Sequence, residues 1–447
     1  GATISVGGRV IVAAQVAAIG VGLALAAPVI WFSLHRKRSV GLQSERGTAS
    51  RATQRIRHGF IVAQIALAFV LLTGAGLLGL SLKRLLGASP GFEAGQVLTA
   101  RLELPFSHYP SSTAALGLIE RLLPALRQQP GVSAAAIGTT LPFGGRAANT
   151  STSVDRTTLE ISPQLRSHYS NGVAGDYWRA LGIPLIAGRL LEDSDNRSAR
   201  SVCVVDEEFA RRYWPNESAL GHRLNPGPTF DAARACTIVG VVGTVKQSEL
   251  SDTAPLGTVY YPFGIYNSPR FSLVVHSTLP PSALAAGLRQ ALQEIDPGLP
   301  LDDLKPMQAR IDDSLVARRS PAVLAAVFAA VALLLAALGT YGVLSHAIAQ
   351  REREIGVRMA LGALPQQVLV QFLKLGAKLL AVGVVLGAAG SWVAGRAMQS
   401  VLFGVGAVDA RVLAATAVTM IAVVLLATFI PSRRATKVDP MVALRAE

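Results

Sequence analysis

Long apolar runs alternate with polar stretches along this chain of 447 residues, and five of the runs are long enough to cross a membrane. A helix rises about 1.5 Å per residue, so roughly 20 residues span the ~30 Å of hydrocarbon in a bilayer. Nearly unbroken runs of Ala, Val, Leu, Ile and Gly of this length are rare in soluble cores. The pattern therefore predicts membrane helices at Val10–Leu34, Gly59–Leu82, Pro321–Ala349, Val368–Ala394 and Val412–Ile430.

The segment between the second and third runs has the shorter periodicities of a soluble α+β domain. We expect strands at Val97–Leu104, Ser133–Thr140, Val202–Val205, Cys236–Val245, Val259–Pro262 and Phe271–His276. We expect helices at Ser111–Gln129, Asp176–Leu181, Glu207–Trp214 and Ser282–Ile295. Residues 144–165 are rich in Gly, Ser, Thr and Asn and are predicted to form a mobile excursion. The segment is long enough for two small subdomains.

A stalk helix is predicted to lead from this domain back into the membrane. Met307, Ile311 and Leu315 recur at four-residue spacing with charges between them, as on one face of a helix. Pro321 follows them, and proline is tolerated in the first turn of a helix but kinks or breaks its interior. Pro321 therefore either opens the third membrane helix or bends a helix that runs through it.

The charge distribution sets the predicted orientation. The formal net charge is +14, and His35–His58 holds seven Lys or Arg against one Glu, whereas Lys83–Arg319 holds 23 basic and 22 acidic residues. Short cytosolic loops are enriched in Lys and Arg, while long domains are exempt from that rule. This concentration in short loops argues against a nucleic-acid-binding surface, so no nucleic acid partner is expected. We place residues 35–58, 350–367 and 431–447 in the cytosol, and residues 83–320 and 395–410 outside.

The two ends of the chain resemble each other, which favours an internal duplication. With an offset of 402 residues, Arg9 aligns with Arg411 and Glu45 with Glu447, and eight apolar positions between them also match. Two unrelated apolar helices followed by basic residues would give part of the same match. A duplication with a period of about 400 residues would make Val10–Leu34 the last helix of a preceding copy. We therefore expect the chain to be the latter part of a longer one.

A charged segment between the third and fourth runs is the strongest candidate for a functional site. Arg351–Arg358 carries five charges in eight residues, so it cannot lie in lipid. Ile355 and Met359 lie four residues apart on one face of the expected short helix. Glu354 and Arg358 have the same spacing, which stabilises a helix by a few tenths of a kcal/mol. Such a helix suits docking into a groove on a soluble ATPase, or lying on anionic lipid headgroups.

Sequence signals for catalysis are lacking. The seven histidines include no H-E-x-x-H motif and no pair at metal-ligand spacing, and neither a G-x-S-x-G elbow nor a G-x-x-x-x-G-K-[ST] phosphate loop occurs. We expect no enzyme activity, no metal and no cofactor, and ATP only through a separate partner. The adjacent acids Asp302-Asp303 and Asp312-Asp313 point in different directions on a helix, so they are predicted to be solvated caps.

The chain contains two cysteines, Cys203 and Cys236, and both lie on predicted strands of the outer domain. An oxidising compartment outside the membrane permits a disulfide between them. Two buried, unpaired thiols are the alternative, and the spacing does not decide between the two.

Several motifs together resemble a known family of ABC transporter permeases. REREIGVRMALGA at 351–363 resembles the FtsX-like permease domain. GIPLIAGR at 182–189, VVDEEFARRYWP at 204–215, ALGHRL at 219–224 and IVGVVGTVKQSEL at 238–250 resemble the MacB-like periplasmic core. The tail PSRRATKVDPMVALR at 431–445 also fits. The resemblance covers nearly the whole chain and points to type VII permeases, in particular to the duplicated, orphan-permease subgroup that lacks a fused ATPase.

The resemblance implies a fold and a division into domains. A membrane α-helical domain, made of a four-helix FtsX-like half and one extra helix, would carry a large α+β MacB-like periplasmic domain. Residues 1–54 would hold the last helix of a preceding repeat and a basic cytosolic linker, and residues 55–82 the first transmembrane helix. Residues 83–320 would form the periplasmic domain with its stalk. Residues 321–447 would form the FtsX-like domain, with three transmembrane helices and a coupling helix at 351–362.

The resemblance also implies a function in the bacterial inner membrane. The protein would be the permease of an export or envelope-maintenance system and would transmit the ATP-driven motion of a cytosolic ABC ATPase to the periplasm. The alternatives are an FtsX-type signalling or scaffold protein that regulates a periplasmic enzyme, and a lipoprotein-extraction permease. Further partners would be a second permease half, in the same chain or as a dimer, membrane lipid, and a periplasmic adaptor with an outer-membrane channel. The ATPase-docking residues would be Arg351, Glu352, Arg353, Glu354, Ile355, Gly356, Arg358, Met359, Leu361 and Gly362.

Overall fold

A computed structural model describes residues 51–145, 149–155, 167–198, 201–252, 256–350, 354–355, 357–358, 361 and 364–435. The predicted span Val10–Leu34 and the basic residues before position 51 lie outside the described residues. The same holds for the tail from residue 436 onward.

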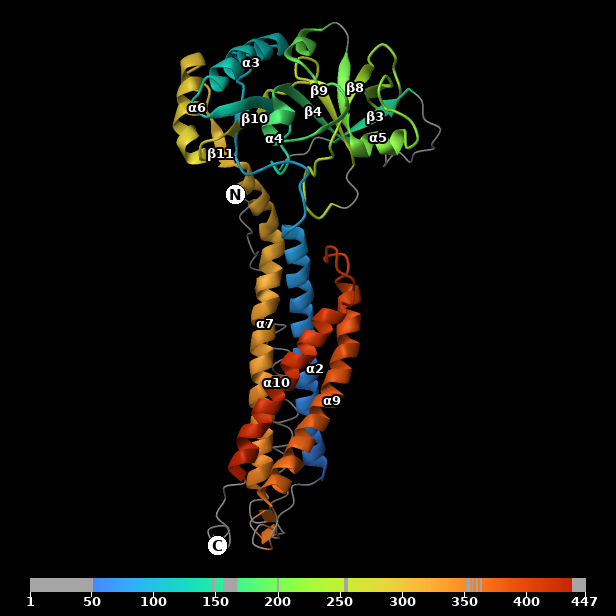
Figure 1. Cartoon of the computed structure of the whole chain (residues 1–447), viewed down its shortest axis with the longest axis vertical. Coiled ribbons are helices and arrows are strands. Elements are labelled where there is room, and N and C mark those ends of the chain that lie inside the picture. Colours follow the sequence, from blue (N-terminus) through green and yellow to red (C-terminus); the bar gives the residue numbers. More distant parts are fainter. Residues whose placement is uncertain are drawn as a thin grey trace. The chain divides into compact units, whose positions relative to one another are not determined.

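Four helices in the described part are long and apolar enough to cross a membrane. They are α2 (Arg51–Leu86), α7 (Met307–Ala349), α9 (Pro365–Ala397) and α10 (Ala410–Ala435), and Figure 1 labels all four. Each contains one of the predicted runs, so these four spans are confirmed. The helices extend beyond the apolar runs at several ends because charged and polar residues outside the hydrocarbon are also helical.

Glycines on α9 let α2 pack closely against it. A Cβ atom added at Gly383 would lie 2.5 Å from Ile65 Cγ2, and one added at Gly387 would lie 2.6 Å from Phe69 Cβ. Ile65 and Phe69 are fully buried there, together with Met420 of α10. In lipid, helices associate through close packing at small residues rather than through the hydrophobic effect, so this contact holds the bundle together.

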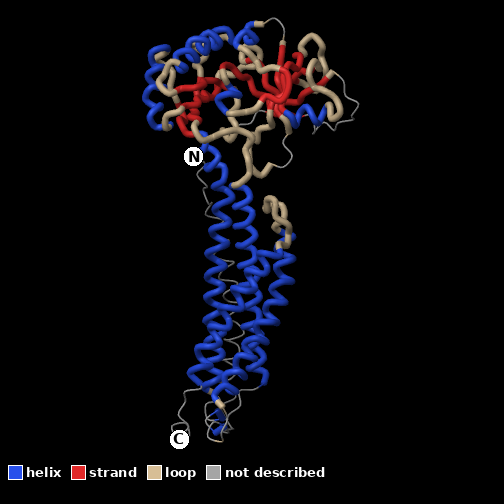
Figure 2. Tube along the Cα trace, viewed as in Figure 1, coloured by secondary structure: helices blue, strands red, loops and turns tan. Residues whose placement is uncertain are grey.

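The chain between the end of α2 and the start of α7 contributes eleven described strands to one mixed sheet, drawn in red in Figure 2. The strand order is β11-β1-β10-β2-β4-β3-β7-β8-β6-β9, with β5 paired to β8. The strands are β1 (Val97–Glu103), β2 (Val132–Gly138), β3 (Asn149–Val154), β4 (Ser167–Gly175), β5 (Leu185–Gly188), β6 (Val202–Asp206), β7 (Arg223–Pro226), β8 (Cys236–Val242), β9 (Thr258–Pro262), β10 (Arg270–Ser277) and β11 (Asp302–Pro306).

Helices cover this sheet as the apolar spacing predicts. α3 (Ser112–Arg127) and α6 (Pro281–Ile295) lie side by side, and their apolar faces share a core with β1, β2 and β10 (Figure 1). α4 (Tyr177–Leu181) and α5 (Glu207–Tyr213) are shorter, and their apolar residues are buried in the two other cores of the domain. The expected α+β architecture is confirmed, although the strands join in one sheet.

Five strands were not predicted, and the clearest case is β4. Its residues are largely polar, yet seven of its nine positions are buried. His168 Nε2 lies 2.7 Å from Tyr213 Oη, and Asn171 Nδ2 donates to Tyr177 Oη at 3.0 Å. Buried polar side chains are tolerated when they are hydrogen-bonded in this way, and apolar alternation does not reveal them.

The predicted excursion at 144–165 is also wrong in part, because Asn149–Val154 forms β3.

The two cysteines form a disulfide between β6 and β8. These strands are parallel neighbours, and the Cα atoms of Cys203 and Cys236 lie 5.8 Å apart. Both residues are buried in the core that contains Phe209 and Trp214. The choice left open by the sequence is therefore settled in favour of the bond.

Candidate functional site

The segment predicted to dock an ATPase is described in part. Glu354 and Ile355, as well as residues 357 and 358, have a helical backbone, and Leu361 follows in a turn. The other predicted docking residues lie outside the described residues: Arg351, Glu352, Arg353, Gly356, Met359 and Gly362.

Ile355 faces the membrane helices. Its exposed fraction is 6%, and it shares a cluster with Leu344 and Ile348 near the end of α7 and with Val368 and Phe372 near the start of α9. The side chain therefore attaches the charged segment to the bundle. It has little surface left for a partner, which the sequence did not reveal because a single apolar position does not tell an inner face from an outer one.

The charged side chains of the segment are accessible. Arg358 Nη2 lies 2.5 Å from Glu354 Oε1, one helical turn away, as the spacing predicts. About half of each side chain is exposed, so water screens the pair and it adds well under ~1 kcal/mol to stability. Leu361 is 83% exposed. Glu354, Val357, Arg358 and Leu361 thus form the accessible surface of the described segment.

α7 connects this surface region to the outer domain in one element. It runs without interruption for 43 residues, which corresponds to about 64 Å of helix. Met307, Ile311 and Leu315 are buried against the core of the outer domain, so the predicted stalk is confirmed. Pro321 lies inside the helix and does not open it.

A second set of contacts lies where the loop between α9 and α10 meets the outer domain. Arg318 of α7 donates to Glu249 Oε2 and to Ser251 Oγ, both at 2.9 Å, and to the carbonyl of Val401 at 3.2 Å. The Lys246 ammonium lies 5.6 Å from the Phe403 ring. Hydrogen bonds from Ser251 and Arg318 lower the pKa of the Glu249 carboxyl, which keeps it ionised.

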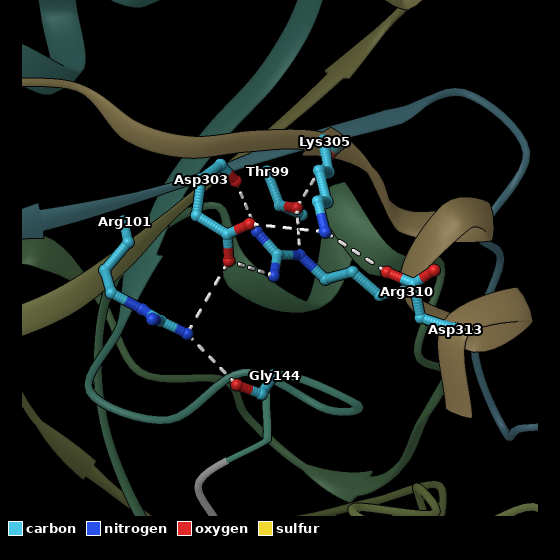
Figure 3. Close-up of polar contacts among 7 residues, drawn as sticks. All are labelled: Thr99, Arg101, Gly144, Asp303, Lys305, Arg310 and Asp313. Atoms are coloured by element: carbon cyan, nitrogen blue, oxygen red, sulfur yellow. Dashed lines mark hydrogen bonds and ion pairs between the residues drawn. The ribbon is translucent and has the colours of Figure 1, made fainter. Parts of the chain in front are cut away.

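The acidic pair Asp302-Asp303 differs from its prediction. Both residues lie in β11, and Asp303 is an ion-pair centre between β1, β11 and the first turns of α7 (Figure 3). Its partners are Arg310 at 2.7 Å and Arg101 and Lys305, both at 3.6 Å. The prediction of a solvated cap is wrong for Asp303, because a short strand places its side chain next to the stalk.

Asp312 and Asp313 also have partners. Asp313 pairs with Lys305 at 3.1 Å, and Asp312 pairs with Arg319 at 3.4 Å. Arg310 lies three residues before Asp313, and Arg319 lies seven residues after Asp312. Asp313 nevertheless pairs with Lys305, which lies outside the helix, and helical spacing alone does not reveal this. No group of three or more His, Cys, Asp or Glu side chains that could hold a metal ion occurs among the described residues.

Arg310 was not singled out from the sequence, although a signal was present. It lies three residues after Met307 and one before Ile311, on the apolar face of the stalk. An arginine at such a position is rarely buried without a partner. The pattern gave no information about which residues would surround it.

Comparison with known proteins identifies both parts of the chain. Residues 61–295 match the MacB-like periplasmic core domain, and residues 326–440 match the FtsX-like permease C-terminal domain. The macrolide export ATP-binding/permease protein MacB of Escherichia coli is 25% identical over 293 residues, which cover 62% of this chain and 43% of that protein. The uncharacterized ABC transporter permease YknZ of Bacillus subtilis is 22% identical over 287 residues, which cover 62% of this chain and 70% of YknZ.

Among solved structures, the periplasmic region of MacB from Actinobacillus actinomycetemcomitans is similar to this chain. It has a TM-score of 0.33 at 15% identity and covers 51% of this chain and 95% of that one. The chain spans less than half the length of the E. coli relative. Because the periplasmic-core match alone covers more than half of its residues, the chain belongs to the FtsX-like, MacB-like family of ABC transporter permeases, as a multi-pass inner-membrane protein with a periplasmic α+β domain.

Proposed function

We propose that this protein transmits the motion of a cytosolic ABC ATPase to its periplasmic domain and thereby drives export or envelope maintenance. The observation that carries the proposal is the attachment of the charged segment to two membrane helices through Ile355. A partner that pulls on this segment would move the ends of α7 and α9. Since α7 continues into the core of the outer domain, the same displacement would reach the periplasmic side.

The docking surface would consist of the accessible side chains of the segment. The guanidinium of Arg358 has five N–H donors, of which the pair with Glu354 uses few, so it can bind a carboxylate on a partner. Leu361 supplies an apolar contact. Ile355 would act indirectly, by holding this surface against the bundle.

Co-purification with an ATPase tests the proposal. Each ABC ATPase of the source genome that lacks its own permease domain would be purified and offered to the full-length chain in nanodiscs. We expect one of them to bind, and we expect the double substitution Arg358→Glu with Leu361→Glu to abolish that binding. The reversed charge would repel the acidic partner groups, and the carboxylate at position 361 would remove the apolar contact.

Arg411→Glu is the matched control, because Arg411 is an exposed arginine at the opposite end of the spans. It should bind as the wild type does. Equal ATPase binding by the Arg358 and Leu361 double variant would contradict the docking surface. A second substitution, Ile355→Asp, should lower the thermal stability of the bundle as well as binding, because Ile355 is buried within the chain.

A further inference from the structure

Arg310 joins the stalk to two strands of the periplasmic sheet. Its Nε donates to Thr99 Oγ1 of β1 at 2.7 Å, its Nη1 to Asp303 Oδ2 at 2.7 Å, and its Nη2 to the main-chain carbonyl of Asp303 at 2.7 Å (Figure 3). Only 6% of the arginine and 1% of Thr99 are exposed. All three nitrogens of one rigid, planar group are therefore used, and the guanidinium is shielded from water, although the Asp303 side chain is 27% exposed.

The backbone conformation of β11 at Asp303 allows this residue to accept hydrogen bonds from Arg310. Asp303 has a φ of +48°, in the left-handed region that most residues avoid. The pairing of β1 with β11 shifts register between Thr99 and Arg101 at the same place. The carbonyl and the carboxylate of Asp303 both accept bonds from Arg310 in this conformation. An Asp tolerates the left-handed region better than most residues, which suits its place here.

Further basic residues keep the Asp303 carboxylate ionised. Burial would raise its pKa, but the hydrogen bond from Arg310 and the charges of Arg310, Lys305 and Arg101 outweigh burial and lower it. Arg101 also donates to the carbonyl of Gly144 at 3.1 Å, which links the loop after β2 to the same centre. Thr99 Oγ1 in turn donates to the carbonyl of Lys305 at 2.8 Å, so the strands are joined next to the arginine.

The contacts of Arg318, two turns further along α7, are of another kind. The Arg318 side chain is 32% exposed and that of its partner Glu249 is 60% exposed. Exposed ion pairs are weak and are screened by salt, whereas a buried arginine that loses one of its partners leaves an uncompensated charge. The bonds of Arg310 are thus much harder to break than those of Arg318.

We propose that Arg310 is a positioning residue that fixes the stalk to β1 and β11 as one rigid body, while the contacts of this body with the loop between α9 and α10, from Arg318 to Val401 and from Lys246 to Phe403, form a releasable latch. A tilt of α7 would then carry the sheet with it and would open the latch. This inference deepens the proposed function, since it names the residue through which motion enters the periplasmic domain. The rigid connection itself does not depend on the ATPase.

Distance measurements on the full-length chain in nanodiscs test the connection without any ATPase. Spin labels would be attached to cysteines at Ala317 on α7 and Gln290 on α6, both exposed positions. The two native cysteines are joined in the disulfide, so they do not take up label. We expect a single narrow distance distribution in the wild type and loss of that narrow distribution in Arg310→Gln. Arg310→Lys should lose it too, because one ammonium nitrogen cannot reach the three acceptors that the separate Nε, Nη1 and Nη2 atoms of arginine contact.

Arg319→Gln is the matched control, because Arg319 lies on the same helix and its pair with Asp312 is exposed. It should keep the narrow distribution, and Arg318→Gln should keep it as well. An Arg310→Gln distribution as narrow as that of Arg319→Gln would overturn the inference. If Arg310→Gln fails to fold, Thr99→Val and Asp303→Asn decide, since each removes part of the site: broadening supports the inference, and unchanged widths in both overturn it.

The two proposals can fail separately. A narrow wild-type distribution that Arg310→Gln broadens, in a protein that binds no ABC ATPase, would remove the proposed function and leave the rigid connection intact. ATPase binding together with identical distance distributions in all variants would support the proposed function and overturn the rigid connection through Arg310.

Discussion

Single residues in this protein show how far burial changes the chemistry of a side chain. Asp206 caps the N-terminus of α5, where Oδ1 accepts the Phe209 amide at 2.8 Å, and the residue is fully buried. Burial raises the pKa of its carboxyl from 3.8 to about 7, although hydrogen bonds from Phe209 and Thr258 oppose the rise. Asp directly before a helix is a common N-cap, but the burial of Asp206 depends on the neighbouring strands β8 and β9, which lie far from it in the sequence.

We predict that Asp206 makes the periplasmic domain less stable as the pH rises through 7. The folded-state pKa lies above the unfolded one, so the stabilising contribution is complete below about pH 4 and is lost as the pH rises through about 7. The loss should be on the order of a few kcal/mol at most. Thermal unfolding of the full-length chain between about pH 5 and pH 8.5 measures it.

Asp206→Asn is the informative variant, because the amide keeps an acceptor for the Phe209 amide and does not ionise. Its unfolding temperature should vary less with pH than that of the wild type. An identical pH dependence in both proteins would show that another group is responsible. His168 adds an opposite dependence at the acidic end, since burial lowers its pKa in the folded state to about 4 while the unfolded imidazole titrates near 6.5. This contribution is present in both proteins, so the comparison of wild type with Asp206→Asn isolates Asp206.

At the scale of elements, apolar period and length predict helices well and strands less well. α3 begins after Ser111, whose side chain accepts the Ala114 amide at 3.2 Å, as expected for an N-cap. The long membrane helices are predicted for the same local reason. β4 is missed because its polar residues are buried and hydrogen-bonded to other parts of the chain. β11 is missed because its residues are charged and only partly buried, without apolar alternation.

We predict that Gly387 is essential for the packing of α2 against α9. Gly387→Ala would place a methyl group 2.6 Å from Phe69 Cβ, so one of the helices must shift, at a cost of roughly 1–3 kcal/mol. The unfolding temperature of the bundle in detergent should fall. Gly342→Ala on α7 is the control, since a Cβ there meets no atom within 4 Å, and it should be neutral or slightly stabilising. Equal stability of the two variants would argue against the close contact.

At the scale of the whole molecule, charge distribution and family agree on one orientation. The basic short loops face the cytosol and the balanced segment faces the periplasm, as in a MacB-like permease. The proposed transmission depends on this arrangement, because the docking surface and the sheet must lie on opposite sides of the membrane.

We predict that a cysteine at Glu217 reacts with a membrane-impermeant maleimide in spheroplasts and that a cysteine at Leu361 does not. Both positions are exposed, so burial cannot explain a difference. The native disulfide leaves no other thiol in the chain. After permeabilisation, both variants should react to the same extent. Labelling of the Leu361 variant alone in spheroplasts would reverse the orientation and exclude the proposed docking surface.

The sequence by itself determined the features that depend on local order: the four described membrane helices, their orientation, the stalk and the accessible Glu354–Arg358 pair. Apolar length, helical spacing and loop charge act over neighbouring residues, so they can be read along the chain. Only the tertiary structure decided that Ile355 packs against α7 and α9, that Cys203 and Cys236 form a disulfide, and that Arg310 is hydrogen-bonded to Asp303. Each of these contacts joins residues that are separated along the chain. Its free energy depends on burial and on hydrogen-bond geometry, which the order of the residues alone does not specify.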